Sequence, residues 1–354
     1  MDPRIQKHAD IVIGHSTKVK KGDNLIIQYS DEGKDLAVEI YKKSAQLGAN
    51  PLILNLPSEA IRAYYEFTPE KFLKNFPSHI YSLVKESDIM ISILSNSNTR
   101  FLSNIDPRLS SIRSKAVNEI QEERMKKRWC LTLYPTNAYA QEAEMSLKEY
   151  EDFVYSAILR DWNKEKKKMV KLKKIFELSN EVSLTGKDTD LTMSIKDRKT
   201  EISDGTHNLP GGEIFTAPIE DSAVGKIFFD LPAVYQGRVV RDIKLEFNKG
   251  EIVDYSSSKN EDILKSMIET DEGSRKIGEL GIGTNKGITR FSRNILFDEK
   301  IYGTIHLAIG RAYEECGGKN KSAIHWDMIK SMKQGRISLD GKIIQENAKF
   351  VIKF

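Results

Sequence analysis

The pattern of apolar and polar residues along the 354-residue chain changes near residue 179. This change restricts the possible folds of the chain more than any other feature. Before it, continuous apolar runs at 24–29, 51–56, 88–94 and 129–135 are separated by helical patterns. Uninterrupted apolar strands between helices are typical of a parallel sheet with helices on both faces. After it, the apolar runs are shorter, alternate with polar residues and are divided by turn residues, which predicts antiparallel strands.

These two patterns predict two domains with different architectures. We expect an α/β domain over residues 1–180, built mainly from a parallel sheet with flanking helices. Over residues 181–354 we expect an α+β domain that is rich in antiparallel strands. Single hydrophobic cores stop growing at roughly 250–300 residues, so the length of the chain also favours two domains.

Composition narrows the class of protein. Apolar residues make up 39% of the chain and charged residues 30%, which fits a globular protein and excludes intrinsic disorder. No apolar run approaches the roughly 18 residues of a membrane span, and no export signal is recognisable, so we expect no membrane association. The two cysteines, Cys130 and Cys316, exclude a disulfide framework or a Cys-rich zinc module. A cytoplasmic location is therefore expected.

One basic segment raises the question of nucleic-acid binding. Arg160–Lys174 carries eight Lys or Arg residues and two acids, interleaved with apolar residues at irregular helical spacing. The formal net charge of the chain is only +4, whereas nucleic-acid binders concentrate positive charge on one face. We favour a partly buried helix with a solvated basic face and expect no nucleic-acid partner.

Common nucleophile signatures are missing, and the chemistry-bearing residues lie in the second half. His325 and Asp327 occupy alternate positions of a predicted strand, so both project to one face, and an imidazole beside a carboxylate is a metal-ligating pair. His306 lies on another predicted strand, 303–310, on the face of its small residues, and Tyr313 follows that strand. For each of these features alone, an ordinary hydrogen bond or a core position is the more common outcome.

Two glutamates are candidates for the same chemistry. Glu213 follows Pro-Gly-Gly and precedes a predicted strand, and Glu279 lies among glycines and apolar residues. A carboxylate in apolar surroundings is costly unless it is paired or bound to a cation. Taken singly, either glutamate is more simply explained as part of a surface turn.

Together these segments resemble a known family. The sequences HNLPGGEIFTAP (207–218), GELGIGTN (278–285), GTIHLAIG (303–310) and SAIHWDM (322–328) resemble, in this order, motifs of the aminopeptidase T family of metallo-aminopeptidases. The resemblance covers nearly the whole chain. The segment between His306 and His325 is shorter than in bacterial members, which leaves the geometry of that loop and its contacts to substrate open.

The resemblance implies a site, cofactors and partners. It implies two divalent metal ions per subunit, zinc or cobalt, and the donor types present also suit manganese. It implies peptide substrates with a free N-terminus and a homodimer whose active site faces a largely enclosed cavity. The resemblance also implies that the domain 181–354 is the metal-binding catalytic domain. The metal ligands implied by the family pattern are Glu213, Glu279, His306, Tyr313, His325 and Asp327.

This donor set allows a specific hypothesis for the reaction. Two divalent ions that share a carboxylate can generate a bridging hydroxide, which would attack the first peptide bond while one ion polarises its carbonyl. Tyr313 would act as a weak ligand or stabilise the tetrahedral intermediate. The general base is not identifiable from the sequence; Glu220 is one candidate, although a surface position is the simpler interpretation.

Two alternatives remain open at this point. Another two-metal hydrolase, such as an amidase or a phosphoesterase, could use the same ligands. A nucleic-acid-binding protein that uses the basic helix 160–174 is the non-enzymatic alternative, and the small net charge favours it less.

Overall fold

The computed structural model of the protein describes residues 2–235 and 237–352, which form two compact units. The first unit comprises residues 1–160 and 205–211, and the second comprises residues 161–204 and 212–354. The chain thus leaves the second unit once, at residue 205, and returns to it at residue 212. Among the helices of the described residues, none combines the length and apolar character needed to cross a membrane.

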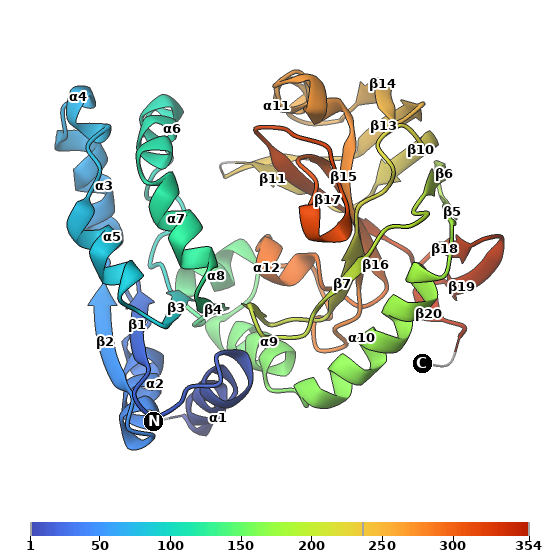
Figure 1. Ribbon diagram of the computed structural model, residues 1–354. Helices are drawn as coiled ribbons and strands as arrows, with labels where there is room; N and C mark the ends of the chain where they lie inside the picture. The colour runs from blue at the N-terminus through green and yellow to red at the C-terminus, as the bar shows by residue number, and fades with distance from the viewer. Residues whose placement is uncertain (1, 236, 353–354) are drawn as a thin grey trace. The chain divides into compact units, whose positions relative to one another are not determined.

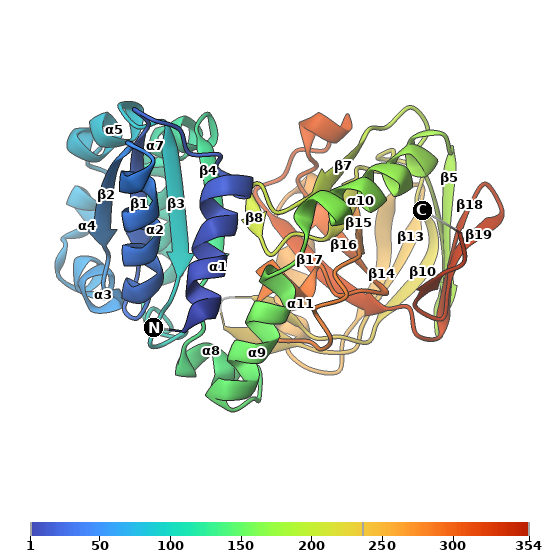
Figure 2. The same ribbon diagram turned by 90° about the horizontal axis from the view of Figure 1, so that it is seen from below.

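The first unit is an α/β structure (Figures 1 and 2). Its strands are β1 (Asn24–Tyr29), β2 (Asn50–Asn55), β3 (Ile89–Leu94), β4 (Arg128–Leu133) and β8 (Asn208–Leu209). Its helices are α1 (Pro3–Ile11), α2 (Lys34–Gln46), α3 (Ser58–Phe67), α4 (Glu70–Leu73), α5 (Ser78–Lys85), α6 (Pro107–Ala116), α7 (Asn118–Met125), α8 (Asn137–Glu142) and α9 (Leu147–Ile158), and a short π-helical segment, η1 (Val12–Ser16), follows α1.

All strands of this unit pair in parallel, in the order β2-β1-β3-β4-β8. Ile26 and Met90 pack on one face of the sheet against Val84 of α5 and Ile120 of α7. Leu25, on the opposite face of β1, is equally buried, and α2 lies beside β1 (Figure 2). Burial on both faces explains why β1 and β3 are continuously apolar in sequence, whereas no residue of the edge strand β2 is fully buried.

The second unit begins with one long helix and is otherwise dominated by strands. Its helices are α10 (Trp162–Glu177), α11 (Glu261–Ile268) and α12 (Ile295–Asp298), with the 3₁₀ turns η2 (Glu272–Arg275) and η3 (Glu314–Cys316). An eight-stranded antiparallel sheet runs in the order β14 (Glu251–Ser256), β13 (Ile243–Asn248), β10 (Val224–Phe229), β6 (Thr189–Ser194), β5 (Glu181–Gly186), β18 (Gly335–Leu339), β19 (Lys342–Glu346) and β20 (Lys349–Phe350).

The second unit also contains a five-stranded antiparallel sheet. Its strands are, in spatial order, β17 (His325–Ser331), β16 (Thr304–Gly310), β15 (Ile277–Gly283), β9 (Glu213–Thr216) and β7 (Thr200–Ser203). A separate two-stranded ribbon consists of β11 (Ala233–Tyr235) and β12 (Arg238–Val240). The apolar side chains of the five-stranded and eight-stranded sheets meet in one core.

The expected fold class is confirmed: a parallel sheet with flanking helices precedes antiparallel sheets. The second compact unit includes α10. Met169, Leu172 and Phe176 of α10 are buried in the core of that unit. The basic residues of α10 surround this apolar stripe, and Lys166 and Lys173 form ion pairs with acids of the same unit.

Candidate metal centre

Five of the six predicted ligands lie on one face of the five-stranded sheet. On β16, Ile305 and Leu307 point into the core, so His306 points to the opposite face. On β17, Trp326 points into the core, so its neighbours His325 and Asp327 share the face of His306. The same alternation holds for β15 and β9, whose core residues are Leu280 and Ile214, and it places Glu279 and Glu213 on this face as well.

Small residues make room for these side chains. A β-carbon added to Gly281 would lie only 2.0 Å from the imidazole of His306, so any larger residue at this position would collide with the ring. The pairing register repeats this arrangement along the sheet: Gly281 lies opposite His306, Gly283 opposite Glu213, Ala308 opposite Glu279 and Asp327, and Gly310 opposite His325. The glycine and alanine positions of the motifs therefore have a steric reason.

The side chains converge into two groups. In the first group, Glu279, His325 and Asp327 each offer an oxygen or nitrogen atom within 4.8 Å of the others. His325 Nε2 lies 3.1 Å from Glu279 Oε2 and 3.7 Å from Asp327 Oδ2. The pair that the alternation on β17 predicts thus has a third member, which comes from β15.

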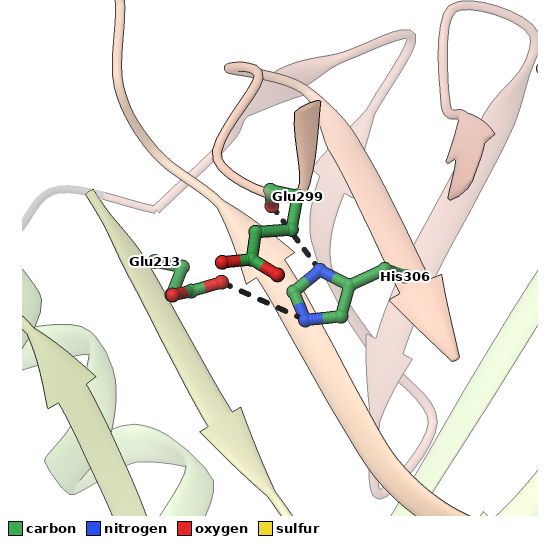
Figure 3. Close-up of side chains that lie close together, drawn as sticks. All are labelled: Glu213, Glu299 and His306. Carbon is green, nitrogen blue, oxygen red and sulfur yellow. Dashed lines mark hydrogen bonds and ion pairs between the residues drawn. The ribbon is translucent and has the colours of Figure 1, made fainter. Parts of the chain in front are cut away.

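The second group contains a residue that the sequence motifs do not reveal. Glu213, His306 and Glu299 also offer atoms within 4.8 Å of one another, and Figure 3 shows the carboxylate of Glu299 beside the other two side chains. His306 Nε2 lies 3.6 Å from Glu213 Oε2. Glu299 directly follows the short helix α12 rather than lying on a strand, so strand alternation carries no signal for it. Its only signal is its place in a charged triplet, Asp298-Glu299-Lys300, close before β16.

Glu279 lies between the two groups. Its Oε1 is 3.3 Å from His306 Nε2, and its Oε2 is 3.1 Å from His325 Nε2. One carboxylate thus faces an imidazole of each group with a different oxygen. A carboxylate in this position is suited to bridge two cations.

Both imidazoles are oriented as metal-ligating histidines usually are. The Nδ1 atom of His306 lies 3.1 Å from the carbonyl oxygen of Glu299, and that of His325 lies 2.7 Å from the carbonyl oxygen of Arg311. Because a carbonyl only accepts, Nδ1 carries the proton in both rings. In the neutral ring, Nε2 then presents its lone pair to the carboxylates, which is unfavourable unless a proton or a cation lies between them.

A buried lysine compensates part of the negative charge. Lys300 is fully buried, and its Nζ lies 3.2 Å from Glu213 Oε1 and also contacts the carboxylate of Glu299. Burial opposes the charge on Lys300, but these two carboxylates outweigh it and raise the pKa of the ammonium group. Four carboxylates against one ammonium still leave three uncompensated negative charges when both imidazoles are neutral.

These residues fit divalent cations. Among the described residues, Glu213 Oε2 and Asp327 Oδ1 are buried and accept no hydrogen bond. An unpaired buried carboxylate oxygen is costly, and a cation would satisfy it. Carboxylates and imidazoles without thiolates are donors that suit zinc, cobalt or manganese.

Without metal ions, protons bound to the carboxylates and imidazoles reduce the excess negative charge of the site. Burial raises the pKa of Glu213 to about 7 and that of Asp327 to about 6. Burial opposes ionisation of Glu279 as well, but hydrogen bonds from His306 and His325 outweigh it and lower its pKa to about 2. Burial disfavours the charged imidazoles, yet Glu279 raises the pKa of His306 to about 10 and that of His325 to about 9. Cations and protons therefore compete for this site.

The other two residues singled out in the sequence lie in different surroundings. The ring of Tyr313 packs against that of His325, with centroids 5.1 Å apart, so the phenol borders the first group. Glu220 forms an ion pair with Arg198 at 2.6 Å and accepts a hydrogen bond from the backbone of Lys319. Glu220 is a member of neither group, and the identity of the general base stays open.

Two adjacent groups of buried imidazoles and carboxylates, joined by one glutamate, define a candidate metalloenzyme. Comparison with known families agrees: the thermophilic metalloprotease (M29) family matches residues 1–347. The chain belongs to this family of metalloproteases, which confirms the resemblance drawn from the four motifs.

Individual proteins extend the comparison. Aminopeptidase AmpS of Bacillus subtilis (strain 168) is 26% identical over 397 aligned positions, which cover 96% of each chain. The solved structure of AmpT from Thermus thermophilus has a TM-score of 0.86 with 20% identity and covers 99% of both chains. A 2,5-dihydroxypyridine dioxygenase from Pseudomonas putida KT2440 shares the fold at a TM-score of 0.65 with 15% identity, over 100% of this chain and 98% of that one. The fold alone therefore does not define the reaction.

Proposed function

We propose that this metalloprotease is an aminopeptidase that removes N-terminal residues from peptides. Membership of the metalloprotease family supports the hydrolysis of peptide bonds, and the relative AmpS, aligned over nearly its whole length, is named an aminopeptidase. The observation that carries the proposal is the pair of buried ligand groups joined by Glu279, together with the buried oxygens of Glu213 and Asp327 that accept no hydrogen bond from the described residues.

The proposed metal site holds two divalent ions. One ion would be held by Glu213, His306 and Glu299, and the other by His325 and Asp327, with Glu279 shared between them. Tyr313 is proposed as a further weak ligand or as a hydrogen-bond donor. We propose zinc or cobalt as the metal, with manganese as a further option, because the donor set suits all three.

The chain's own residues contribute binding and orientation to the reaction. In such a site, divalent cations supply polarisation of the scissile carbonyl and acidification of water. Burial and the carboxylates of Glu279 and Asp327 raise the pKa of Tyr313, so its phenol stays protonated at neutral pH and can donate to an oxygen that gains negative charge. A free α-amine has a lone pair that a divalent ion in this site could bind, which favours a substrate with a free N-terminus over a blocked one.

A direct assay tests this function. The purified protein should hydrolyse aminoacyl-p-nitroanilides, lose this activity after exhaustive chelation and regain it with zinc, cobalt or manganese. N-acetylated versions of the same substrates should be cleaved at least 100-fold more slowly. Activity that survives chelation would sink the proposal, as would its absence with all three metals.

The same assay separates the alternatives. Comparable rates on N-blocked amides or on phosphate esters would favour another two-metal hydrolase. Tight DNA or RNA binding with a steep dependence on salt would favour a role for the basic helix 160–174 instead.

Substitution of the shared carboxylate tests the ligand assignment. Glu279→Gln keeps the shape of the side chain but removes its charge, so we expect it to lower the metal content below one ion per chain and to abolish measurable turnover. Glu246→Gln, an exposed position on β13, serves as the matched control and should retain wild-type metal content. Elemental analysis of both variants after dialysis measures the difference, and unchanged metal content in Glu279→Gln would remove this residue from the ligand set.

The proposal also includes an oligomeric state and a location. The family resemblance supports a homodimer, and light scattering of the purified protein would test it. Cys130 and Cys316 are buried free thiols, which is compatible with a reducing cytoplasm. Localisation of the tagged protein by cell fractionation would test that location.

A further inference from the structure

A cavity of about 260 Å³ adjoins the first ligand group. It lies within the second unit, between the ribbon strand β11, the segment 291–298 that contains α12, and strand β17. His325 and Asp327 form part of its lining, so it is continuous with the candidate metal centre. Val234 and Ile295 at its rim are 36% and 48% exposed, which shows that the cavity is reached from solvent.

The remaining lining is largely apolar. Val234, Phe291, Ile295 and Ile329 provide side chains without hydrogen-bonding groups. Contacts with Trp326, whose indole N–H donates to the carbonyl oxygen of Val234 at 3.2 Å, hold β11 against β17. This wall is therefore positioned by the same strand that carries two of the candidate ligands.

The charged residues of the lining have identifiable roles. Asp298 is 1% exposed, and its Oδ1 accepts hydrogen bonds from the backbone N–H and the hydroxyl of Ser292, so it stabilises the 291–298 segment. Arg293 is a further charged residue of the lining, and Asp327 lies at the end next to the ligand group.

We propose that this cavity is the subsite for the side chain of the substrate's N-terminal residue and that it prefers apolar side chains of the size of Leu, Met or Phe. The inference rests on the proposed aminopeptidase function. The N-terminal residue carries its side chain and its free α-amine on one Cα atom, which matches an apolar wall beside the candidate metal ligands. The second residue of a peptide carries no free amine.

The expected selectivity follows from the buried apolar area. Moving a Leu or Phe side chain out of water favours binding enough to raise kcat/KM roughly 10- to 100-fold over that of Ala. Lys and Arg should be poorer than Leu, because a charged side chain loses hydration among the apolar residues of the wall.

Two peptide series test the assignment: X-Ala-Ala, in which the first residue varies, and Ala-X-Ala, in which the second varies. In the wild-type enzyme, kcat/KM should follow the apolar size of X in the first series and vary less than about threefold in the second. Val234→Phe narrows the cavity and should lower the Leu-to-Ala ratio in the first series at least tenfold. Val253→Phe, at an exposed position of β14 outside the cavity, should leave that ratio unchanged.

The outcomes distinguish this inference from the function on which it rests. Wild-type activity on Ala-Ala-Ala without any preference in the first series would overturn the subsite assignment and leave the aminopeptidase function intact. A preference that Val234→Phe changes only in the second series would also overturn it. Absence of activity on every peptide with every metal would instead refute the proposed function.

Discussion

Lys300 is a buried cation in the candidate metal centre. It is fully buried and contacts two carboxylates of the second group, Glu213 and Glu299. A buried ammonium that pairs with carboxylates stabilises them when no other cation is present. Its importance should therefore depend on whether metal is bound.

Lys300→Met should destabilise the metal-free protein by about 3 kcal/mol, because it leaves buried carboxylates without a partner. With saturating zinc the loss should fall below about 1 kcal/mol, because the cation supplies the missing charge. Urea unfolding of both forms measures the difference. Lys330→Met is the matched control: Lys330 is also buried, but its Nζ donates to the carbonyl oxygen of Phe228, so zinc should not change its effect. Equal losses with and without zinc in Lys300→Met would contradict the assigned role.

The buried imidazole of His8 should make the stability of the first unit depend on pH. It is fully buried, and burial lowers its pKa to about 3. Thr132 donates its hydroxyl to the carbonyl oxygen of Leu209 and therefore accepts from His8 Nε2. Among the described residues, His8 Nδ1 has no partner, so a second proton on this ring would be unsatisfied.

The unfolded chain protonates this histidine below its ordinary pKa of about 6.5, whereas the folded unit does not until about pH 3. Stability should therefore fall with decreasing pH between these values, by about 1.4 kcal/mol per pH unit from this group. His8→Gln, which can still donate to Thr132, should remove this contribution. Hydrogen exchange of the β4 amides between pH 6.5 and 4.5 compares the two proteins, and parallel pH profiles would show that His8 does not contribute.

At the scale of elements, the two faces of the five-stranded sheet have different roles. One face contributes apolar residues to the core, and the other presents ligands with a glycine or an alanine opposite each of them. Antiparallel pairing brings facing side chains within about 5 Å, so a bulky neighbour would occupy the space of an imidazole. The small residues are therefore part of the site although they offer no donor atom.

Gly281→Ala should weaken metal binding without removing any ligand. Its new β-carbon would overlap the ring of His306, which must then turn away from Glu279. Displacement of a ligand in this way should reduce zinc affinity at least tenfold. Competition with a chromogenic chelator measures the affinity. Gly14→Ala is a suitable control, because nothing lies within 4 Å of its new carbon; a wild-type affinity in Gly281→Ala would refute the steric explanation.

At the scale of the whole molecule, the assignment of α10 decides which part of the chain can fold around the metal centre. Met169, Leu172 and Phe176 are buried in the core of the second unit. A division at residue 180 would separate them from that core, whereas the compact unit begins at Asp161. That either part folds as an independent domain remains a proposal.

A fragment of residues 161–354 should fold and bind metal, whereas a fragment of residues 181–354 should not. Each large apolar side chain contributes about 1.5–3 kcal/mol on burial, so loss of three removes much of the stability of a typical domain. Circular dichroism, NMR dispersion and zinc content of the two fragments test this. Leu172→Asp in the longer fragment should reproduce the failure of the shorter one, and a well-folded fragment 181–354 would contradict the prediction.

Comparison of expected and observed elements shows where local patterns suffice. The strands β1 to β4 lie within one or two residues of the apolar runs, because turn residues do not interrupt these runs. The helices α3, α4 and α5 had no such signal, since each is short and begins directly after a proline that suggests a break. The helical segment between β3 and β4 is divided into two helices, α6 and α7, which meet at Val117.

For the candidate site, strand alternation was enough to predict that His325 and Asp327 share a face, because a side chain's direction on a strand depends only on its own position. Family motifs extended the prediction to ligands from β9, β15 and β16. The prediction did not include Glu299 and Lys300, because neither residue lies on a strand of the sheet. Each reaches the centre through the path of the chain after α12. Which strands become neighbours, and in which register, depends on contacts between segments far apart in sequence, so the convergence of the two groups around Glu279 is a property of the folded protein.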